Sequence, residues 1–223
     1  MTSTARRSGR PKKEDDRANA RERLLNAAHE LMCERSTIDV PVNEIANRAG
    51  LNVALINYYF GGKDGLLLQL AMRHQSGYSA VLDTLLEAPF TAAKKLTLHI
   101  RGMVRAFRRV PYLQRLQHKI LRDSSEEAAH ECGVALVQPL VSFYRKLAAQ
   151  GIEDGSLRPV DHMHLYMSVV GSCDFLYSAS ASLSYGFNID HVDEALSESY
   201  VEHLISLMTR GLFTEAATAQ PQA

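Results

Sequence analysis

The sequence has few cysteines and no long apolar run, and both absences narrow the class of protein. Its 223 residues include three cysteines, Cys33, Cys132 and Cys173, which lie far apart and form no Cys-x-x-Cys pair. We therefore expect neither a disulfide framework nor a zinc site, and we expect a reducing, cytoplasmic location. The first 23 residues lack the apolar stretch of a secretion signal. The most apolar segment, residues 163–187, contains Asp174 and many serines, which make it too polar for a membrane-spanning helix.

The motifs of common enzyme classes are also missing. The chain contains no Gly-x-Ser-x-Gly, no His-Glu-x-x-His and no phosphate-cradling glycine loop. Among the nine histidines, His162 and His164 are two residues apart, so a helix would place them on different faces. No cysteine or carboxylate completes a metal-binding set around them. We therefore expect no enzymatic activity, no metal and no cofactor.

The chain has no net charge, but its charges are unevenly distributed. Residues 1–63 carry eleven Lys and Arg against eight Asp and Glu, and the remainder carries fourteen against seventeen. A basic first segment on an acidic body favours a polyanionic partner for that segment. An apolar content of 46% is enough for a folded core.

Hydrophobic periodicity predicts an all-α protein. From Arg17 onward apolar residues recur at three- and four-residue spacing, and no run of strict alternation indicates a strand. Expected helices begin at Arg17, span Val42–Ala49 and Val53–Phe60, and continue as a long helix from Lys63. Breaks are expected at Pro89, at Pro111 in the first turn of a helix, at Ser124-Ser125, and in residues 151–159 and 186–190. The predicted divisions are a flexible basic arm over 1–16, a small domain over 17–63, a larger helical domain over 64–214 and a disordered tail over 215–223.

The segment "GLNVALINYYFGGKDGL", residues 50–66, combines apolar and polar aromatic residues in an unusual way. A short helix, a turn at Gly50 and a second short helix make a helix-turn-helix, whose second helix enters the major groove of DNA. Leu55, Ile56 and Phe60 can then pack against the first helix of the small domain. The sequence therefore predicts that this second helix buries one side and presents the other to DNA.

The polar side of that helix carries Asn57, Tyr58 and Tyr59. Asparagine is suited to a bidentate contact with adenine, and tyrosine hydroxyls are suited to phosphate oxygens. Lys63 begins the next helix, where its charge and the free N–H groups both favour a phosphate. The alternative is that the tyrosines are core aromatics at the end of a helix.

Residues 21–67, "RERLLNAAHELMCERSTIDVPVNEIANRAGLNVALINYYFGGKDGLL", resemble the N-terminal domain of TetR/AcrR-type transcriptional repressors. The matching residues are Ala27-Ala28, Ile45-Ala46, Ala49-Gly50, Phe60, Lys63 and Leu66. The chain departs from the family pattern in three places. Ser36 stands where the family often has glycine, Pro41-Val42 where it often has threonine, and Asn57 where it often has tyrosine.

The resemblance implies a homodimer that binds a palindromic operator and is released when a small molecule fills the C-terminal domain. The expected function is therefore a ligand-responsive transcriptional repressor. The alternatives are an activator or global regulator with the same DNA-binding head, or, from another class, a helical lipid-binding module. The positions that the family aims at the groove are Asn43, Val53, Ala54, Asn57 and Tyr58. The positions at which the family contacts the DNA backbone are Val42, Tyr59 and Lys63.

Two further groups of cations have more than one interpretation. Arg7 and Arg10 belong to the basic arm "SGRPKK", which is either a minor-groove arm or a solvated tail. A second group repeats on one face of two consecutive helices, at Arg101, Arg105, Arg108, Arg115, Lys119 and Arg122. This basic row is either a solvated face, a docking site for an anionic ligand such as an acyl-CoA, or a contact with the DNA backbone.

The last two apolar segments are predicted to form the dimer. Residues 165–185 combine leucines with small residues, and residues 192–212 offer a second apolar face, so two helices from each subunit can form a four-helix interface. The two-fold symmetry would place the DNA-binding heads roughly 34–36 Å apart, or somewhat wider. The predicted interface residues are Leu176, Ser180, Leu183, Leu196, Tyr200, Leu204, Leu207 and Met208.

The same larger domain is predicted to hold a small apolar or amphipathic effector between its helices. An anionic head group is expected if the basic row takes part, and Asp174 is the expected orienting group unless it pairs with an arginine. The predicted lining residues are Met103, Phe107, Leu116, Phe143, Met167, Val170, Cys173, Asp174 and Tyr177. Each of them also fits an ordinary core.

Overall fold

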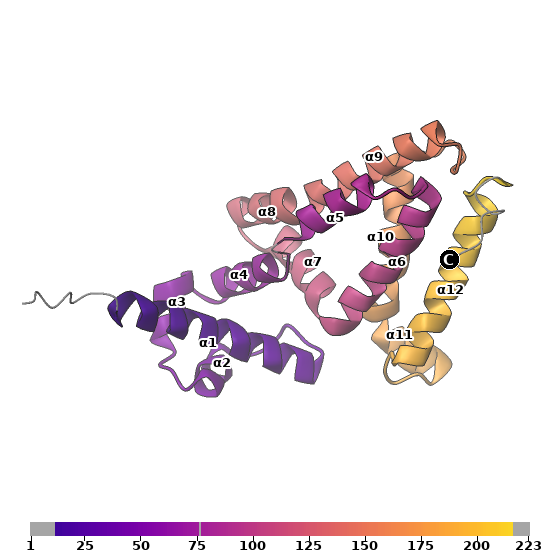
Figure 1. The fold of residues 1–223 in the computed structure, drawn as a ribbon. Coiled ribbons are helices and arrows are strands. Elements are labelled where there is room, and N and C mark those ends of the chain that lie inside the picture. The colour runs from indigo at the N-terminus through magenta and orange to yellow at the C-terminus, as the bar shows by residue number, and fades with distance from the viewer. Residues whose placement is uncertain (1–11, 76, 216–223) are drawn as a thin grey trace, which may run out of the picture. The chain divides into compact units, whose positions relative to one another are not determined.

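The computed structural model describes residues 12–75 and 77–215, and the side chains of Gln75, Ser180 and residues 12–16 lie outside that description. All regular elements in these ranges are helices, which confirms the predicted all-α class (Figure 1). The helices are α1 Lys12–Arg35, α2 Val42–Ala49, α3 Ala54–Phe60, α4 Lys63–Gln75, α5 Tyr78–Glu87, α6 Ala92–Arg109, α7 Leu113–Asp123, α8 Glu126–Cys132, the π-helix η1 Gly133–Val137, α9 Gln138–Glu153, α10 His162–Ser178, α11 Ser180–Phe187 and α12 Glu194–Gly211.

The chain divides into two compact units, the first ending at Leu70 and the second beginning at Ala71. The first unit contains α1, α2, α3 and the beginning of α4. Its interior is built from the apolar face of α1, together with one side of α2, of α3 and of α4. The largest fully buried side chains of this unit are Leu24, Leu25, Met32, Ile45, Ile56, Leu66, Leu67 and Leu70.

Left-handed residues set the sharp ends of the short helices in the first unit. Gly50 has φ 62° after α2, and its N–H donates to the carbonyls of Ala46 and Asn47. Gly61 has φ 72° after α3, and glycine adopts this conformation without steric cost. Ser36, before α2, also has a positive φ, 47°. The serine therefore carries the backbone strain that glycine would avoid.

The second unit is a bundle in which α6 packs against α9, α10 and α12, and α9 also packs against α5 (Figure 1). One apolar core joins these five helices. Its members on α6, α9 and α10 include Leu96, Ile100, Met103, Phe107, Phe143, Tyr144, Leu147, Leu165, Val169, Leu176 and Tyr177. No helix of the described ranges is both long and apolar enough to cross a membrane.

Short polar side chains begin four of the helices of this unit. Thr91 and Ser125 accept backbone N–H groups at the first turns of α6 and α8. Asp161 accepts the N–H groups of Met163 and His164, and Asp193 does the same for Leu196 at the start of α12. Such caps satisfy N–H groups that have no partner within the helix.

The loop after α9 closes the bundle by capping α6. The Asp154 carboxylate accepts the N–H of Ala92 at 2.7 Å, and the Ser156 hydroxyl accepts the N–H of Ala93 at 3.2 Å. Leu157 is buried against Gly151, where a side chain would collide with it. The segment "EDGSLRP" therefore links the start of α6 to the end of α9.

Several expected boundaries differ from the structure. The helix that opens at Lys63 ends at Gln75, and α5 begins after Gly77, which has φ 81°. Pro111 precedes α7 and does not lie in its first turn, because Leu113 begins the helix. The segment 165–185 is not one helix, since α10 ends at Ser178 and α11 begins at Ser180.

Candidate nucleic-acid interface

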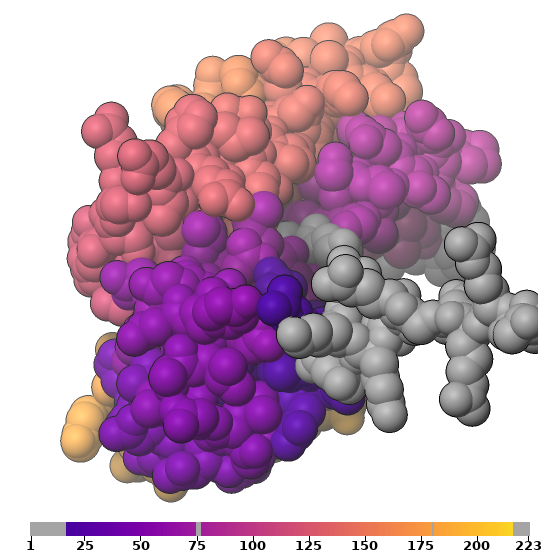
Figure 2. All heavy atoms as spheres, turned by 90° about the vertical axis from the view of Figure 1, so that its left-hand side faces the viewer, coloured from indigo at the N-terminus to yellow at the C-terminus, as the bar shows by residue number. Residues whose placement is uncertain are grey.

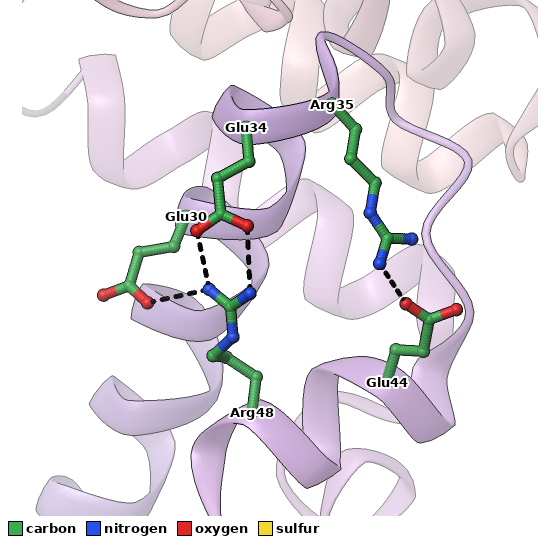
Figure 3. A network of polar contacts seen from close by, with 5 residues as sticks. All are labelled: Glu30, Glu34, Arg35, Glu44 and Arg48. Carbon is green, nitrogen blue, oxygen red and sulfur yellow. Dashed lines mark hydrogen bonds and ion pairs between the residues drawn. The ribbon is translucent and has the colours of Figure 1, made fainter.

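Ion pairs hold α2 against α1 in the first unit (Figure 3). Two nitrogens of Arg48 on α2 reach the two carboxylate oxygens of Glu34 on α1 at 2.8 and 2.9 Å. Arg48 also lies 3.5 Å from Glu30, and Arg35 pairs with Glu44. The hydrogen bond from Arg48 holds the pKa of Glu34 below its usual value. Exposed pairs contribute little stability, but a bidentate pair fixes the angle at which the two helices meet.

Two arginines of α1 contact the end of α2, the end of α3 and helix α4. Arg23 donates to the carbonyl of Ala49 at 2.6 Å, at the start of the turn that leads to α3. Arg21 donates to Gln69 on α4 at 2.6 Å, and its guanidinium carbon lies 5.4 Å from the centre of the Phe60 ring. Helix α1 therefore supports both ends of α3, whose seven residues would be unstable alone.

Helix α3 buries one side and exposes the other, as the sequence predicts. Ile56 is 1% exposed, and Leu55 and Phe60 are half-buried. The Asn52 side chain accepts the N–H of Ala54 at 2.8 Å, which starts the helix one residue later than expected. On the opposite side Tyr58 is 63% exposed and Asn57 is exposed beside it. The exposed side offers an amide and a phenol hydroxyl, which can bond base edges and phosphates.

The five residues predicted to face the groove are all exposed, namely Asn43, Val53, Ala54, Asn57 and Tyr58. The three predicted backbone contacts, Val42, Tyr59 and Lys63, are half-buried. Tyr59 packs edge-on between Tyr58 and Phe60, so it also belongs to the support of the helix. In the space-filling view the first unit presents a convex surface in the purple of α2 to α4 (Figure 2). Arg7 and Arg10 lie outside the described residues.

Sequence reasoning missed two residues that position α3. Arg48 lies in a charged stretch that has no unusual feature. The one sequence signal was that α1 carries acidic residues with which an arginine of α2 could pair. Gly65 lies half-buried in the first turn of α4, directly against the backbone of Phe60, where a Cβ atom would overlap the Phe60 carbonyl oxygen. A glycine two residues inside a helix is the signal that points to such an approach.

Two family models match the chain. Residues 24–70 match the model for bacterial regulatory proteins of the tetR family, and residues 89–218 match that for the tetracyclin repressor-like C-terminal domain. The second match alone covers more than half of the sequence.

The chain belongs to the TetR family. Its first unit is the DNA-binding head of such a regulator, and its second unit carries the family's C-terminal domain. Members of this family are DNA-binding regulators of transcription, and the family is not one of enzymes.

Curated relatives match this TetR-family chain over a short part of its length. The regulator BetI of Brucella anthropi is 46% identical over 54 residues, which are 24% of this chain and 27% of BetI. The probable regulator YttP of Bacillus subtilis is 35% identical over 68 residues, which are 30% of this chain and 33% of YttP. The chain thus matches between a quarter and a third of the length of these regulators.

Solved structures share most of the fold. The regulator FadR of Bacillus subtilis, solved with stearoyl-CoA, matches this chain with a TM-score of 0.61 and 22% identity. The match covers 83% of this chain and 97% of FadR. A TetR/AcrR regulator of Thermobifida fusca has a TM-score of 0.63 at 18% identity and covers 86% and 97%. At these identities the likeness concerns the fold.

The residues predicted to line an effector site divide between core and surface of the TetR-family C-terminal domain. Met103, Phe107, Phe143, Cys173 and Tyr177 are buried in its main core, and Val170 packs against that core. Leu116 is buried on α7, outside this cluster. Met167 is 60% exposed on α10, so it does not face the interior. Its role as a lining residue stays a prediction, and its exposure reflects that α10 carries apolar residues on both faces.

Asp174, the predicted orienting group, lies half-buried on α10 beside α7. Burial raises the pKa of its carboxyl group, while the charges of His118 and Arg115 on α7 and a hydrogen bond from Ser178 oppose that rise. The sequence left open whether Asp174 meets an effector or an arginine. In the structure it faces basic residues of α7.

The basic row is largely paired within the domain. Arg101 lies 2.6 Å from Glu202, and Arg108 lies 2.9 Å from Glu194, so both reach acidic residues of α12. Lys119 and Arg122 reach Asp123 at 3.9 and 2.7 Å. Much of the row's charge is therefore neutralised by its own neighbours.

The predicted dimer residues also divide between core and surface. Leu176 and Leu204 are 5% and 3% exposed within one protomer, where they pack in its own core, so their place in a dimer interface stays a prediction. Tyr200 donates to the carbonyl of Ser172, and Met208 packs against the same core. Leu183 and Leu196 are half-buried, Leu207 is 52% exposed, and the Ser180 side chain lies outside the described residues.

Proposed function

We propose that this chain is a transcriptional repressor that binds a palindromic operator as a homodimer and is released by a small apolar or amphipathic molecule. The exposed polar face of α3, held at a fixed angle within a TetR-family head, is the observation that carries the proposal. Asn57, Tyr58, Asn43, Val53 and Ala54 would contact base edges, and Val42, Tyr59 and Lys63 would contact the backbone. The arm with Arg7 and Arg10 would add minor-groove contacts.

Substitutions at Asn57 and Lys63 test this placement on a DNA site selected from a random duplex library. We expect Asn57→Ala to cost roughly 1–3 kcal/mol of binding free energy and to relax the preference at one base position per half-site. Lys63→Ala should instead weaken binding to all sequences and lower the salt slope by about one. Lys94→Ala removes the same charge from a half-buried residue of the second unit and should change neither. Unchanged affinity in both head variants would exclude α3 from the groove.

The homodimer is supported by an unpartnered apolar stripe on α10. Met163, Met167 and Phe175 are 53%, 60% and 62% exposed, and their spacing in multiples of four places them on one helix face. Contiguous exposed apolar surface is typical of protein interfaces. We propose that this stripe, with Leu207 on α12, meets its symmetric copy, in place of the buried Leu176 and Leu204.

Charge introduced into the stripe should separate the subunits without unfolding them. We expect Phe175→Glu to sediment as a monomer and to lose operator binding, because a buried unpaired carboxylate opposes association. Its thermal midpoint at the same protomer concentration serves as the folding check. Val81→Glu is the matched control, since Val81 on α5 is 61% exposed, and it should remain dimeric. A dimeric Phe175→Glu variant would place the interface elsewhere.

Release by a small molecule is supported by the family's C-terminal domain and by the likeness to FadR solved with stearoyl-CoA. The dimer would have one state in which the spacing of its two DNA-binding heads fits the operator and one in which it does not. An effector can shift DNA binding only if it binds these two states with different affinities. Because the basic row is mostly ion-paired, an apolar or amphipathic molecule fits the domain better than one recognised by its charge.

A further inference from the structure

The second unit holds a cluster of aromatic side chains with polar tips at the meeting point of α5, α6, α9 and α10. We name Tyr78, His99, Phe143, Tyr144 and Tyr166 the aromatic cluster. The His99 ring centre lies 4.5 Å from that of Phe143 and 5.4 Å from that of Tyr144. Tyr144 also meets Tyr166 edge-on at 5.7 Å, and Tyr78 packs against the same core. The core of the domain therefore contains several groups that can form hydrogen bonds.

Two polar atoms of the aromatic cluster have no hydrogen-bond partner among the described residues. These are Nε2 of His99 and the hydroxyl of Tyr144, whose side chains are 5% and 0% exposed. Some other buried groups of the domain are paired: the Tyr112 hydroxyl meets His74 at 2.8 Å, and the Lys95 amine donates to Gln150 at 3.0 Å. Nε of Arg115 and Oδ1 of Asp174 are, like the two atoms of the aromatic cluster, buried without a partner among the described residues. Unpaired buried polar atoms are destabilising and rare, so each requires an explanation.

A surface cleft of about 310 Å³ reaches the aromatic cluster from the side of α5 and α9. Leu82 and Phe143 are its main buried apolar residues, and Val134 of η1 forms part of its wall. Phe143 belongs both to the cleft and to the aromatic cluster, because the ring that lines the cleft also packs on His99. The volume suits a small molecule, and π-helical turns such as η1 are frequent at functional sites.

The electrostatics of the site select an uncharged ligand. Burial lowers the pKa of His99 to about 4 and raises that of Tyr144 well above its usual value. Both groups are therefore neutral at pH 7, and together they can donate and accept hydrogen bonds. At the cleft Lys146 already pairs with Asp83 at 3.6 Å. A charged group beside His99 would be buried without a counter-charge, which is strongly unfavourable.

We propose that the effector is an uncharged, mostly apolar molecule with a hydroxyl or carbonyl oxygen that bonds to His99 and Tyr144, while its apolar body lies against Leu82 and Phe143. This inference rests on the proposed release by a small molecule and names the chemistry of that molecule. The two unpaired atoms are then a preformed polar anchor, whose partner is the ligand.

Thermal unfolding with two probes of equal chain length, 1-decanol and decanoate, tests the anchor. We expect 1-decanol to raise the midpoint of the wild-type protein by about 3 °C and decanoate to leave it nearly unchanged. In Tyr144→Phe the free protein should melt about 2–4 °C higher, because a buried unpaired hydroxyl is gone, and the shift by 1-decanol should fall below about 1 °C.

Tyr112→Phe is the matched control, because Tyr112 is equally buried but its hydroxyl is bonded to His74. It should melt lower than the wild type and keep the full shift by 1-decanol. The proposal is overturned if Tyr144→Phe melts lower as Tyr112→Phe does, if it keeps the 1-decanol shift, or if the wild type responds to decanoate alone. DNA binding is measured separately on the selected site, so loss of operator binding would count against the proposed function and leave this test intact.

Discussion

Replacing Gly65 with alanine is expected to lower affinity for operator DNA at least tenfold and to destabilise the first unit by roughly 1–3 kcal/mol. A Cβ atom on Gly65 would overlap the carbonyl oxygen of Phe60 and lie 2.9 Å from its carbonyl carbon. Both are backbone atoms, so no side-chain rotation can relieve the overlap. The end of α3 must then move away from α4, and Asn57 and Tyr58 move with it.

Gly102→Ala on α6 is the control for this substitution. No other group lies within 4 Å of the position of its Cβ atom, so alanine should stabilise the helix by about 0.5–1 kcal/mol and leave DNA binding unchanged. Fluorescence anisotropy of a labelled operator and urea unfolding measure both effects. Wild-type affinity of Gly65→Ala would mean that the contact between Phe60 and Gly65 does not set the position of α3.

Stability is expected to fall by roughly 2–3 kcal/mol between pH 7 and pH 4.5 through His99 alone. Burial lowers the pKa of His99 from 6.5 to about 4 in the folded state. Between these values the unfolded chain binds a proton that the folded chain does not, so the stabilisation is complete above pH 6.5 and is lost as pH falls toward 4.

Urea unfolding of the wild type and of His99→Phe at pH 7 and 4.5 isolates this contribution. The difference in unfolding free energy between the two proteins should change with pH by the amount above, because phenylalanine fills the site without titrating. His203→Gln removes an exposed histidine of α12 and should follow the wild type. Parallel pH curves for the wild type and His99→Phe would show that His99 is not held neutral in the core.

The head was predictable from sequence because local signals determine it. Val42–Ala49 is bounded by Pro41 and Gly50, and α3 ends where Gly61 begins, so turn chemistry and periodicity agree there. The exposure of Asn57 and Tyr58 followed from the same pattern. The contact of Gly65 with Phe60 and the pairing of Arg48 with Glu34 join helices through space, and no local pattern records them.

The second unit was less predictable because its helices are apolar on more than one side. On α10 Met167 faces outward and Leu176 inward, although both are large apolar residues in one stretch. Periodicity shows that such a helix is buried, but it does not show whether its own core or a second copy buries each face. The unpaired atoms of His99 and Tyr144 depend on which helices meet around them, which only the folded structure reveals.

Selection of the wild-type protein on a random duplex library tests the central claim, sequence-specific DNA binding by a symmetric dimer, most directly. The account predicts enrichment of an inverted repeat whose half-sites are centred about 10 base pairs apart or somewhat more. It also predicts that Phe175→Glu enriches no such repeat. Enrichment of a single unsymmetrical site by the wild type, or of no sequence at all, would contradict it.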